Sequence, residues 1–235
     1  MALSAYVTVG WYRCLVPYFA VIMCKKLHFI PVLLLLLTAL VAFSACKKDV
    51  VKPVNNSDVE KVKQVLTGDI VLSTKAKIGV EDRTLLPTGC PAKYEFKWNN
   101  DDTMTVVLRD FSVGKMPFII YFSCRSKILT LNSFEKQDAK FQGEGWVKFS
   151  GENGKIAFEE KKLTTKKEEK SGASILGYFN TNTQEIEFSI NYNMFNVTSQ
   201  CFRQKIDKKR IDRYEEEFAQ YEKDLAAEKK KRGIN

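Results

Sequence analysis

The chain has 235 residues, of which 45% are apolar and 28% charged, and it carries a net charge of +9. These proportions exclude a wholly disordered chain and a polytopic membrane protein, and the length fits one domain of ordinary size. The single histidine, His28, lies in a segment that we expect to be removed during maturation.

A long apolar run covers residues 27–45. It follows Lys25 and Lys26 and ends in small residues before Cys46, which is typical of a secretory signal peptide. A membrane-spanning helix needs about 20 apolar residues, so the run is marginal for that role. We therefore predict a signal peptide over residues 23–45.

Residues 1–22 fit this scheme badly, because they add a separate apolar stretch, with Trp11 and Arg13, in front of the signal. Met23 is followed by Cys24-Lys25-Lys26, which is how a signal peptide begins. We expect translation to start at Met23 and the first 22 residues to be a misassigned start. The alternative is a membrane hairpin.

The end of the signal, Phe43-Ser44-Ala45-Cys46, resembles the lipobox of bacterial lipoproteins. In that family the cysteine is acylated and becomes the new N-terminus, so the resemblance implies lipidation of Cys46. Phe43 replaces the usual Leu, Val or Ile but supplies the same apolar bulk. The resemblance also implies a cell-envelope location, on the periplasmic or the cell-surface side. An uncleaved anchor helix with an incidental cysteine is the alternative.

Residues 46–56 are polar, include Pro53, and predict a tether. The sequence Ser57-Asp58-Val59-Glu60 has the spacing of a capping box, and valines at helical intervals follow it until Gly68. A short amphipathic helix is expected there.

From Asp69 to Lys205 the apolar period changes to two. Residues 93–98 and 185–194 alternate apolar and polar side chains, as antiparallel strands with one solvated face do. Further strand candidates are residues 69–78, 103–113, 117–124, 127–132, 139–150, 155–162, 172–181 and 197–206, with turn signals at 99–102, 150–154 and 180–183. We predict a mainly β domain over residues 57–206, an antiparallel meander closing into a β-barrel, with a β-sandwich as the alternative.

Residues 207–235 are rich in charge and predict a long C-terminal amphipathic helix. Its apolar residues recur at steps of three and four and form a narrow stripe, made of Ile211, Tyr214, Phe218, Tyr221 and Leu225. The stripe either packs on the barrel or binds a protein partner.

Removing residues 1–45 takes away three basic and no acidic side chains, which leaves a net charge of +6. This mild charge does not indicate nucleic-acid binding. The finished chain has no histidine, so Ser-His-Asp and Cys-His catalysis lack their base, and zinc and iron sites lack a common ligand. The sequence contains no phosphate loop or dinucleotide fingerprint. We expect no metal, no cofactor and no enzymatic activity.

A hydrolase that uses paired carboxylates remains as an alternative to a non-catalytic protein. The candidates are Glu95, Asp110, Glu144 and Glu187. Strand patterning puts Glu95 and Glu187 on the polar face, which favours a solvated surface over a catalytic role.

Three cysteines remain besides Cys46, namely Cys90, Cys124 and Cys201. One pair could form a disulfide in an oxidising envelope, or all three could be buried and reduced. Asp102-Thr103-Met104 resembles the acceptor sequence for O-glycans in envelope proteins of the Bacteroidota, which implies glycosylation of Thr103 in an accessible turn.

Aromatic side chains are abundant on the expected strands, and Tyr94, Phe96, Trp98, Phe188 and Tyr192 either line an apolar pocket or fill the core. The order of signal, tether, short helix, meander and C-terminal helix resembles lipoproteins of unknown function from gut Bacteroidota, some of which resemble calycins (lipocalin-like β-barrels). The resemblance implies a membrane-anchored barrel whose open mouth binds a small apolar or amphipathic ligand. An envelope scaffold that binds a protein through its C-terminal helix is the alternative.

Overall fold

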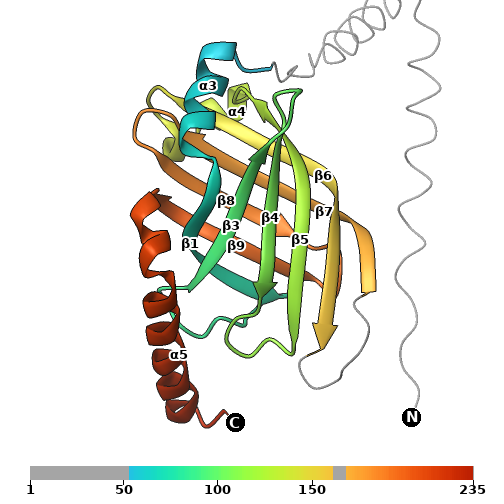
Figure 1. Cartoon of the computed structure of the whole chain (residues 1–235), viewed down its shortest axis with the longest axis vertical. Helices are drawn as coiled ribbons and strands as arrows, with labels where there is room; N and C mark the ends of the chain where they lie inside the picture. Colours follow the sequence, from blue (N-terminus) through green and yellow to red (C-terminus); the bar gives the residue numbers. More distant parts are fainter. Residues whose placement is uncertain (1–52, 161–167, 235) are drawn as a thin grey trace, which may run out of the picture. The chain divides into compact units, whose positions relative to one another are not determined.

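The computed structural model describes residues 53–160 and 168–234 (Figure 1). The predicted start at Met23, the signal peptide, Cys46 and most of the tether lie outside these residues. The expected mainly β architecture is confirmed, because eight antiparallel strands close into a barrel. In the described ranges, no helix combines the length and apolar character needed to cross a membrane.

The barrel strands follow one another around the wall in chain order. They are β1 (Gly68–Ile78), β3 (Cys90–Trp98), β4 (Met104–Phe111), β5 (Phe118–Leu129), β6 (Trp146–Glu160), β7 (Glu168–Asn180), β8 (Glu185–Asn191) and β9 (Val197–Lys205). The short β2 (Glu81–Asp82) pairs only with the end of β1. The barrel closes at Thr74 of β1, which is opposite both Cys90 of β3 and Cys201 of β9. Closure leaves no long free edge, which is why a barrel is favoured over an open sheet.

Several strand boundaries differ from the expectation. The strand expected over residues 139–150 begins only at Trp146, because residues 139–141 form a 3-10 helix. Residues 150–154 do not form a turn but a bulge inside β6, where the pairing register with β7 shifts between Gly151 and Gly154. A Cβ on Gly151 would lie 2.4 Å from the carbonyl oxygen of Arg125, so only glycine allows β6 to approach β5 here. Asn153 supplies the left-handed conformation, with φ of 56°. The expected strands 117–124 and 127–132 likewise form the single strand β5.

Helix α3 (Asn56–Val65) covers one end of the barrel (Figure 1). Its cap is Asn55, whose side chain accepts from the Asp58 N–H at 2.8 Å, and not Ser57 as the sequence suggested. Val62 and Leu66 are fully buried. The chain thus enters the barrel through the end that α3 covers.

Two short helices, α4 (Ser133–Gln137) and the 3-10 helix η1 (Ala139–Phe141), connect β5 to β6. The C-terminal helix has two parts, the 3-10 helix η2 (Lys208–Arg213) and α5 (Tyr214–Lys231), and α5 lies beside β3. Phe218, Tyr221 and Leu225 pack against the barrel core. The apolar stripe is therefore occupied by packing within its own domain.

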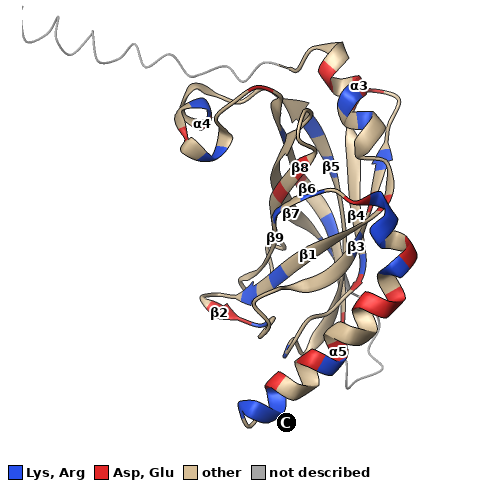
Figure 2. Cartoon of the chain, turned by 90° about the vertical axis from the view of Figure 1, so that its left-hand side faces the viewer, with Lys and Arg blue, Asp and Glu red and all other residues tan. Residues whose placement is uncertain are grey.

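Charge along α5 follows the helix dipole, with Glu215–Glu217 in the first turn and Lys229–Lys231 in the last (Figure 2). The basic end lies far from α3 along the length of the barrel (Figure 2). The described core draws its buried apolar residues from Val54 onward. We therefore expect a chain of residues 47–235 to fold.

Candidate functional site

The barrel interior holds four of the five predicted ligand-binding residues. Tyr94, Phe96, Phe188 and Tyr192 are between 0% and 3% exposed. The rings of Tyr94 and Phe188 meet edge to face with centroids 5.0 Å apart. A side chain facing a ligand-sized space would keep accessible surface towards it, and these residues keep almost none. The interior in this structure is a filled core.

Hydroxyl groups inside the barrel satisfy one another. The Tyr94 hydroxyl lies 3.2 Å from that of Thr74, and the Tyr192 hydroxyl lies 2.9 Å from that of Ser199. Burial raises the pKa of Tyr94 well above its usual value. Both phenols are therefore structural hydrogen-bonding groups.

Trp98, the fifth predicted residue, lies at the barrel end and is partly buried. Its indole N–H donates to the carbonyl of Leu66 at 2.6 Å, and Lys63 Nζ lies 5.5 Å from its ring centroid. Trp98 thus fastens the C-terminal end of α3 to the barrel.

The opposite end is filled by loops in the part of the chain that the structure describes. Leu85, Val113, Met116 and Met194 are all buried there, with exposures of at most 7%. The open mouth implied by the calycin resemblance is consequently not present among the described residues. Recognition through the interior would require these loops or α3 to move.

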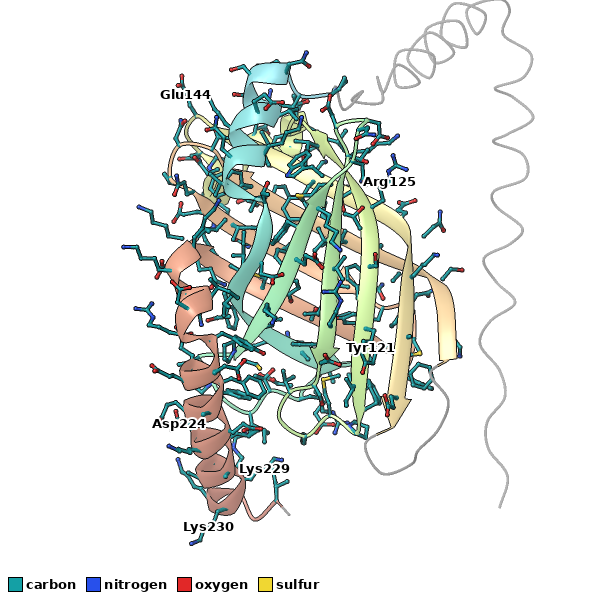
Figure 3. The ribbon with its side chains drawn as sticks, viewed as in Figure 1. Tyr121, Arg125, Glu144, Asp224, Lys229 and Lys230 are labelled. Atoms are coloured by element: carbon teal, nitrogen blue, oxygen red, sulfur yellow. The ribbon has the colours of Figure 1, made fainter. Side chains whose placement is uncertain are left out.

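The outer wall carries a hollow of about 300 Å³ across β4, β5 and β6, which we call the outer groove. Its outward-facing residues are Val107, Arg109, Tyr121, Ser123, Lys155 and Ala157. It forms because short side chains lie between longer ones: Ser123 is flanked by Val107 and Lys155, and Ala157 is opposite Tyr121. Figure 3 labels Tyr121 on β5.

The outer groove has an apolar floor and cationic sides. The Lys155 ammonium has no partner among the described residues, and Arg109 pairs with Glu95 at 2.8 Å. A hydrogen bond to Asp110, with burial and the charge of Glu159, raises the pKa of Tyr121 to about 12. Its phenol is therefore neutral at physiological pH. This combination fits a molecule with an apolar body and an anionic group.

One signal of the outer groove is present in the amino-acid pattern. Val107 and Tyr121 interrupt the alternation of β4 and β5, because they are apolar or aromatic at outward positions. Which of these positions become neighbours depends on strand register, which the pattern does not contain.

The carboxylate candidates do not face one another. Glu95 of β3 pairs with Lys97 and with Arg109 of β4, and Glu187 of β8 pairs with Arg203 of β9. Strands β1 and β9 separate them, which at about 4.8 Å per strand places them about 14 Å apart around the wall. That exceeds the separation of about 6.5–9.5 Å that inverting glycosidases use.

The other two candidates are also apart. Asp110 lies in the bulge of β4 with φ of 53°, and Glu144 is exposed in the segment before β6 (Figure 3). Within residues 53–160 and 168–234, no three His, Cys, Asp or Glu side chains gather in a way that could hold a metal ion.

Cys90, Cys124 and Cys201 are free and buried in this structure, which corresponds to the reduced one of the two alternatives. Cys90 and Cys201 both face Thr74 from opposite sides of β1. Two strand spacings put their Cα atoms about 10 Å apart, whereas a disulfide needs about 7 Å or less.

Thr103 is 7% exposed and its hydroxyl is fully engaged. It donates to Asp101 at 2.7 Å and accepts from Arg125 at 2.7 Å and from Asn99 at 3.0 Å. The turn is as predicted, but the expectation of an accessible glycan acceptor was wrong, because these partners bury the oxygen.

Residues 45–233 match a family described as a domain of unknown function, DUF4903. The chain belongs to this family. The match covers every described strand of the DUF4903 barrel and begins one residue before Cys46. Comparison with curated proteins and with solved structures finds no match.

Proposed function

We propose that this DUF4903 chain is a lipoprotein of the bacterial cell envelope, anchored through acylated Cys46, that binds a small amphipathic anion without catalysis. The proposed ligand binding is supported by one observation: the barrel interior is filled, whereas the outer groove is apolar and has cationic sides. The lipobox resemblance supports the anchor, as does a family match that begins beside Cys46. Either the periplasmic or the cell-surface side is compatible with it.

The size and chemistry of the groove define the ligand class. A volume of about 300 Å³ is at the lower end of small-molecule sites, which are mostly apolar with a few placed polar groups. Val107, Tyr121 and Ala157 would contact an acyl chain or a ring. Lys155 and Arg109 would contact a carboxylate or a sulfate, and Ser123 offers a hydroxyl.

Titration of residues 47–235 with a fluorescent fatty acid tests the groove. The variant Ser123→Leu fills its floor, so we expect the dissociation constant to rise at least tenfold. The matched control is Ser189→Leu, an exposed position on β8, which should change it less than twofold. Equal effects of the two variants, or no binding by the native chain, would contradict the groove.

The charge contact of Lys155 can be tested by comparing an anionic ligand with a neutral one. Lys155→Glu should weaken binding of the fluorescent fatty acid at least tenfold but leave binding of the matching neutral alcohol within twofold. A loss shared by both probes would show that the substitution disturbs the wall and does not remove a charge contact.

Intact-mass measurement of the protein purified from its native membrane tests the anchor. We expect a chain that begins at Cys46 and carries acyl groups, and a Cys46→Ala variant without them. A mass that includes His28, or an unmodified Cys46, would refute the anchor and leave the groove unaffected.

A ligand inside the barrel is the second candidate, favoured by one observation. The hydroxyl of Ser126 is buried and has no hydrogen-bond partner among the described residues. Native mass spectrometry would detect a retained ligand. If Ser123→Leu kept full binding of the fatty acid, the interior would replace the outer groove as the site.

A scaffold that binds a protein through α5 is the remaining alternative. Phe218, Tyr221 and Leu225 pack on the barrel, so α5 would have to detach first. Deletion of residues 211–235 distinguishes the cases in a pull-down, since an interface helix leaves a folded domain that has lost its partner.

A further inference from the structure

A second hollow, of about 660 Å³, lies between the last turn of α3, the β7–β8 turn and η2. We call it the lysine hollow. Its polar lining consists of Gln64, Gln184, Lys205, Asp207, Lys208 and Lys209. These residues come from three distant parts of the chain, and the fold brings three ammonium groups to one concave surface.

The single carboxylate of the lysine hollow is already neutralised. Asp207 caps η2 by accepting from the Lys209 N–H at 3.0 Å, and its other oxygen lies 3.2 Å from Arg213. Glu185 pairs with Lys205 across the strands, but its carboxylate accepts from the Thr183 hydroxyl at 2.9 Å. The hollow is therefore electropositive.

The ammonium groups themselves are largely unused. Lys208 Nζ donates to the Gln64 carbonyl at 2.9 Å, which holds it at the rim between α3 and η2. The side chains of Lys205 and Lys209 are exposed and have no partner among the described residues. Each lysine ammonium carries three donors, so the site offers more hydrogen bonds than the protein uses.

We infer that the lysine hollow binds a phosphate group. A phosphate brings several acceptor oxygens and more than one negative charge, which matches convergent lysines acting as point charges. The Gln64 and Gln184 side chains add neutral donors at the same surface. The phosphate can belong to a lipid head group or to a soluble phosphate ester.

The place of the lysine hollow in the fold bears on the source of the phosphate. It adjoins α3, the helix from which the chain leads back to Cys46. Six residues separate Cys46 from Pro53, and an extended chain of that length spans about 25 Å at most. If the proposed anchor holds, this end is kept near the bilayer, whereas Lys229 and Lys230 lie at the other end (Figure 3). Only this point rests on the proposed function.

The test uses residues 47–235 in two arms, both free of any lipid anchor. One arm titrates inorganic phosphate, and the other measures sedimentation with vesicles of phosphatidylglycerol and phosphatidylcholine against phosphatidylcholine alone. The variant K205E/K209E should weaken binding at least tenfold in at least one arm. The matched control K229E/K230E, with the same change in charge, should stay within twofold.

The arms separate the sources of the phosphate. Loss in both arms assigns a general phosphate site, and loss with vesicles alone assigns the head group. Equal loss in the two double variants, or no binding by the native chain in either arm, would overturn the inference. Unchanged thermal unfolding of both variants verifies that the exposed substitutions leave the fold intact. Because no arm depends on acylation, failure here is distinct from failure of the Cys46 anchor.

Discussion

Lys148 of β6 places its ammonium 2.8 and 3.0 Å from the two carboxylate oxygens of Glu135 in α4, and both side chains are at most 15% exposed. Glu135 also receives the Asn132 N–H at 2.8 Å and the Tyr178 hydroxyl at 2.9 Å. Burial disfavours its charge, but these hydrogen bonds outweigh burial and lower its pKa. The pair holds the β5–β6 connection against the outer wall.

Removing the cation of this pair should destabilise the barrel strongly. Lys148→Met leaves Glu135 nearly buried and without a counter-charge, which costs about 3 kcal/mol. Urea unfolding of residues 47–235 measures the change. The double variant Lys148→Met/Glu135→Gln should recover part of it, because no unpaired charge remains.

An exposed ion pair is the control for that experiment. Lys61 and Asp58 of α3 lie 3.3 Å apart, with Lys61 51% exposed, so Lys61→Met should cost less than about 0.5 kcal/mol. Equal costs for Lys61→Met and Lys148→Met would show that burial of the Glu135 pair adds nothing.

Gly177 should not tolerate a methyl group. A Cβ at Gly177 would lie 2.1 Å from Cζ, the tip of the ring of Phe149, which is opposite Gly177 in the β6–β7 pairing. We expect Gly177→Ala to lower the free energy of unfolding by about 1–3 kcal/mol through overpacking. In a double-mutant cycle with Phe149→Leu, the two costs should be less than additive. Strict additivity would contradict the contact.

Tyr221 should anchor α5 through its hydroxyl as well as its ring. The Gly114 N–H donates to this oxygen at 3.1 Å in a buried setting, so Tyr221→Phe leaves that donor unsatisfied. The expected cost is about 1–2 kcal/mol in urea unfolding. Tyr214→Phe is the control. We expect it to lower the free energy of unfolding by less than about 0.5 kcal/mol, because the ring, whose centroid lies 5.3 Å from Lys93 Nζ, is retained. Similar costs would argue against the anchor.

Because the thiols are buried, we expect them to react slowly with thiol reagents, and we expect the free energy of unfolding to decrease at alkaline pH. Burial raises the pKa of Cys90 to about 12 and that of Cys124 to about 11, and it raises the pKa of Cys201 as well. Native protein at pH 8 should react slowly with a disulfide reagent, and urea-unfolded residues 47–235 should titrate three thiols.

The raised pKa values of the native thiols make the protein less stable as the pH rises. Native thiols keep their protons where unfolded thiols, with pKa values near 9, lose them. Their contribution to stability is therefore complete below pH 9 and declines as pH rises towards 12. The urea midpoint should fall between pH 8.5 and 10.5, and Cys124→Ala should reduce that fall. A pH-independent midpoint would contradict the shifts.

Much of the secondary structure was readable from residue order. The alternation of residues 93–98 placed Tyr94 and Phe96 on the inner face of β3, and the spacing of Phe218, Tyr221 and Leu225 gave the inward stripe of α5. Such patterns work because a strand or a helix repeats its faces at a fixed local period. The absence of histidine after residue 28 is equally a property of the chain alone.

Other features depended on contacts between distant segments. The barrel closes where Thr74 of β1 pairs with Cys201 of β9. The bulge at Gly151 is needed because β5 lies close against it. Ser123 and Ala157 line one groove only because of the β5–β6 register. Whether Tyr94 and Phe188 line a pocket or fill a core depends on how much of the space enclosed by the barrel the side chains occupy. A local period reports which way a side chain faces, and it holds no information about what stands opposite.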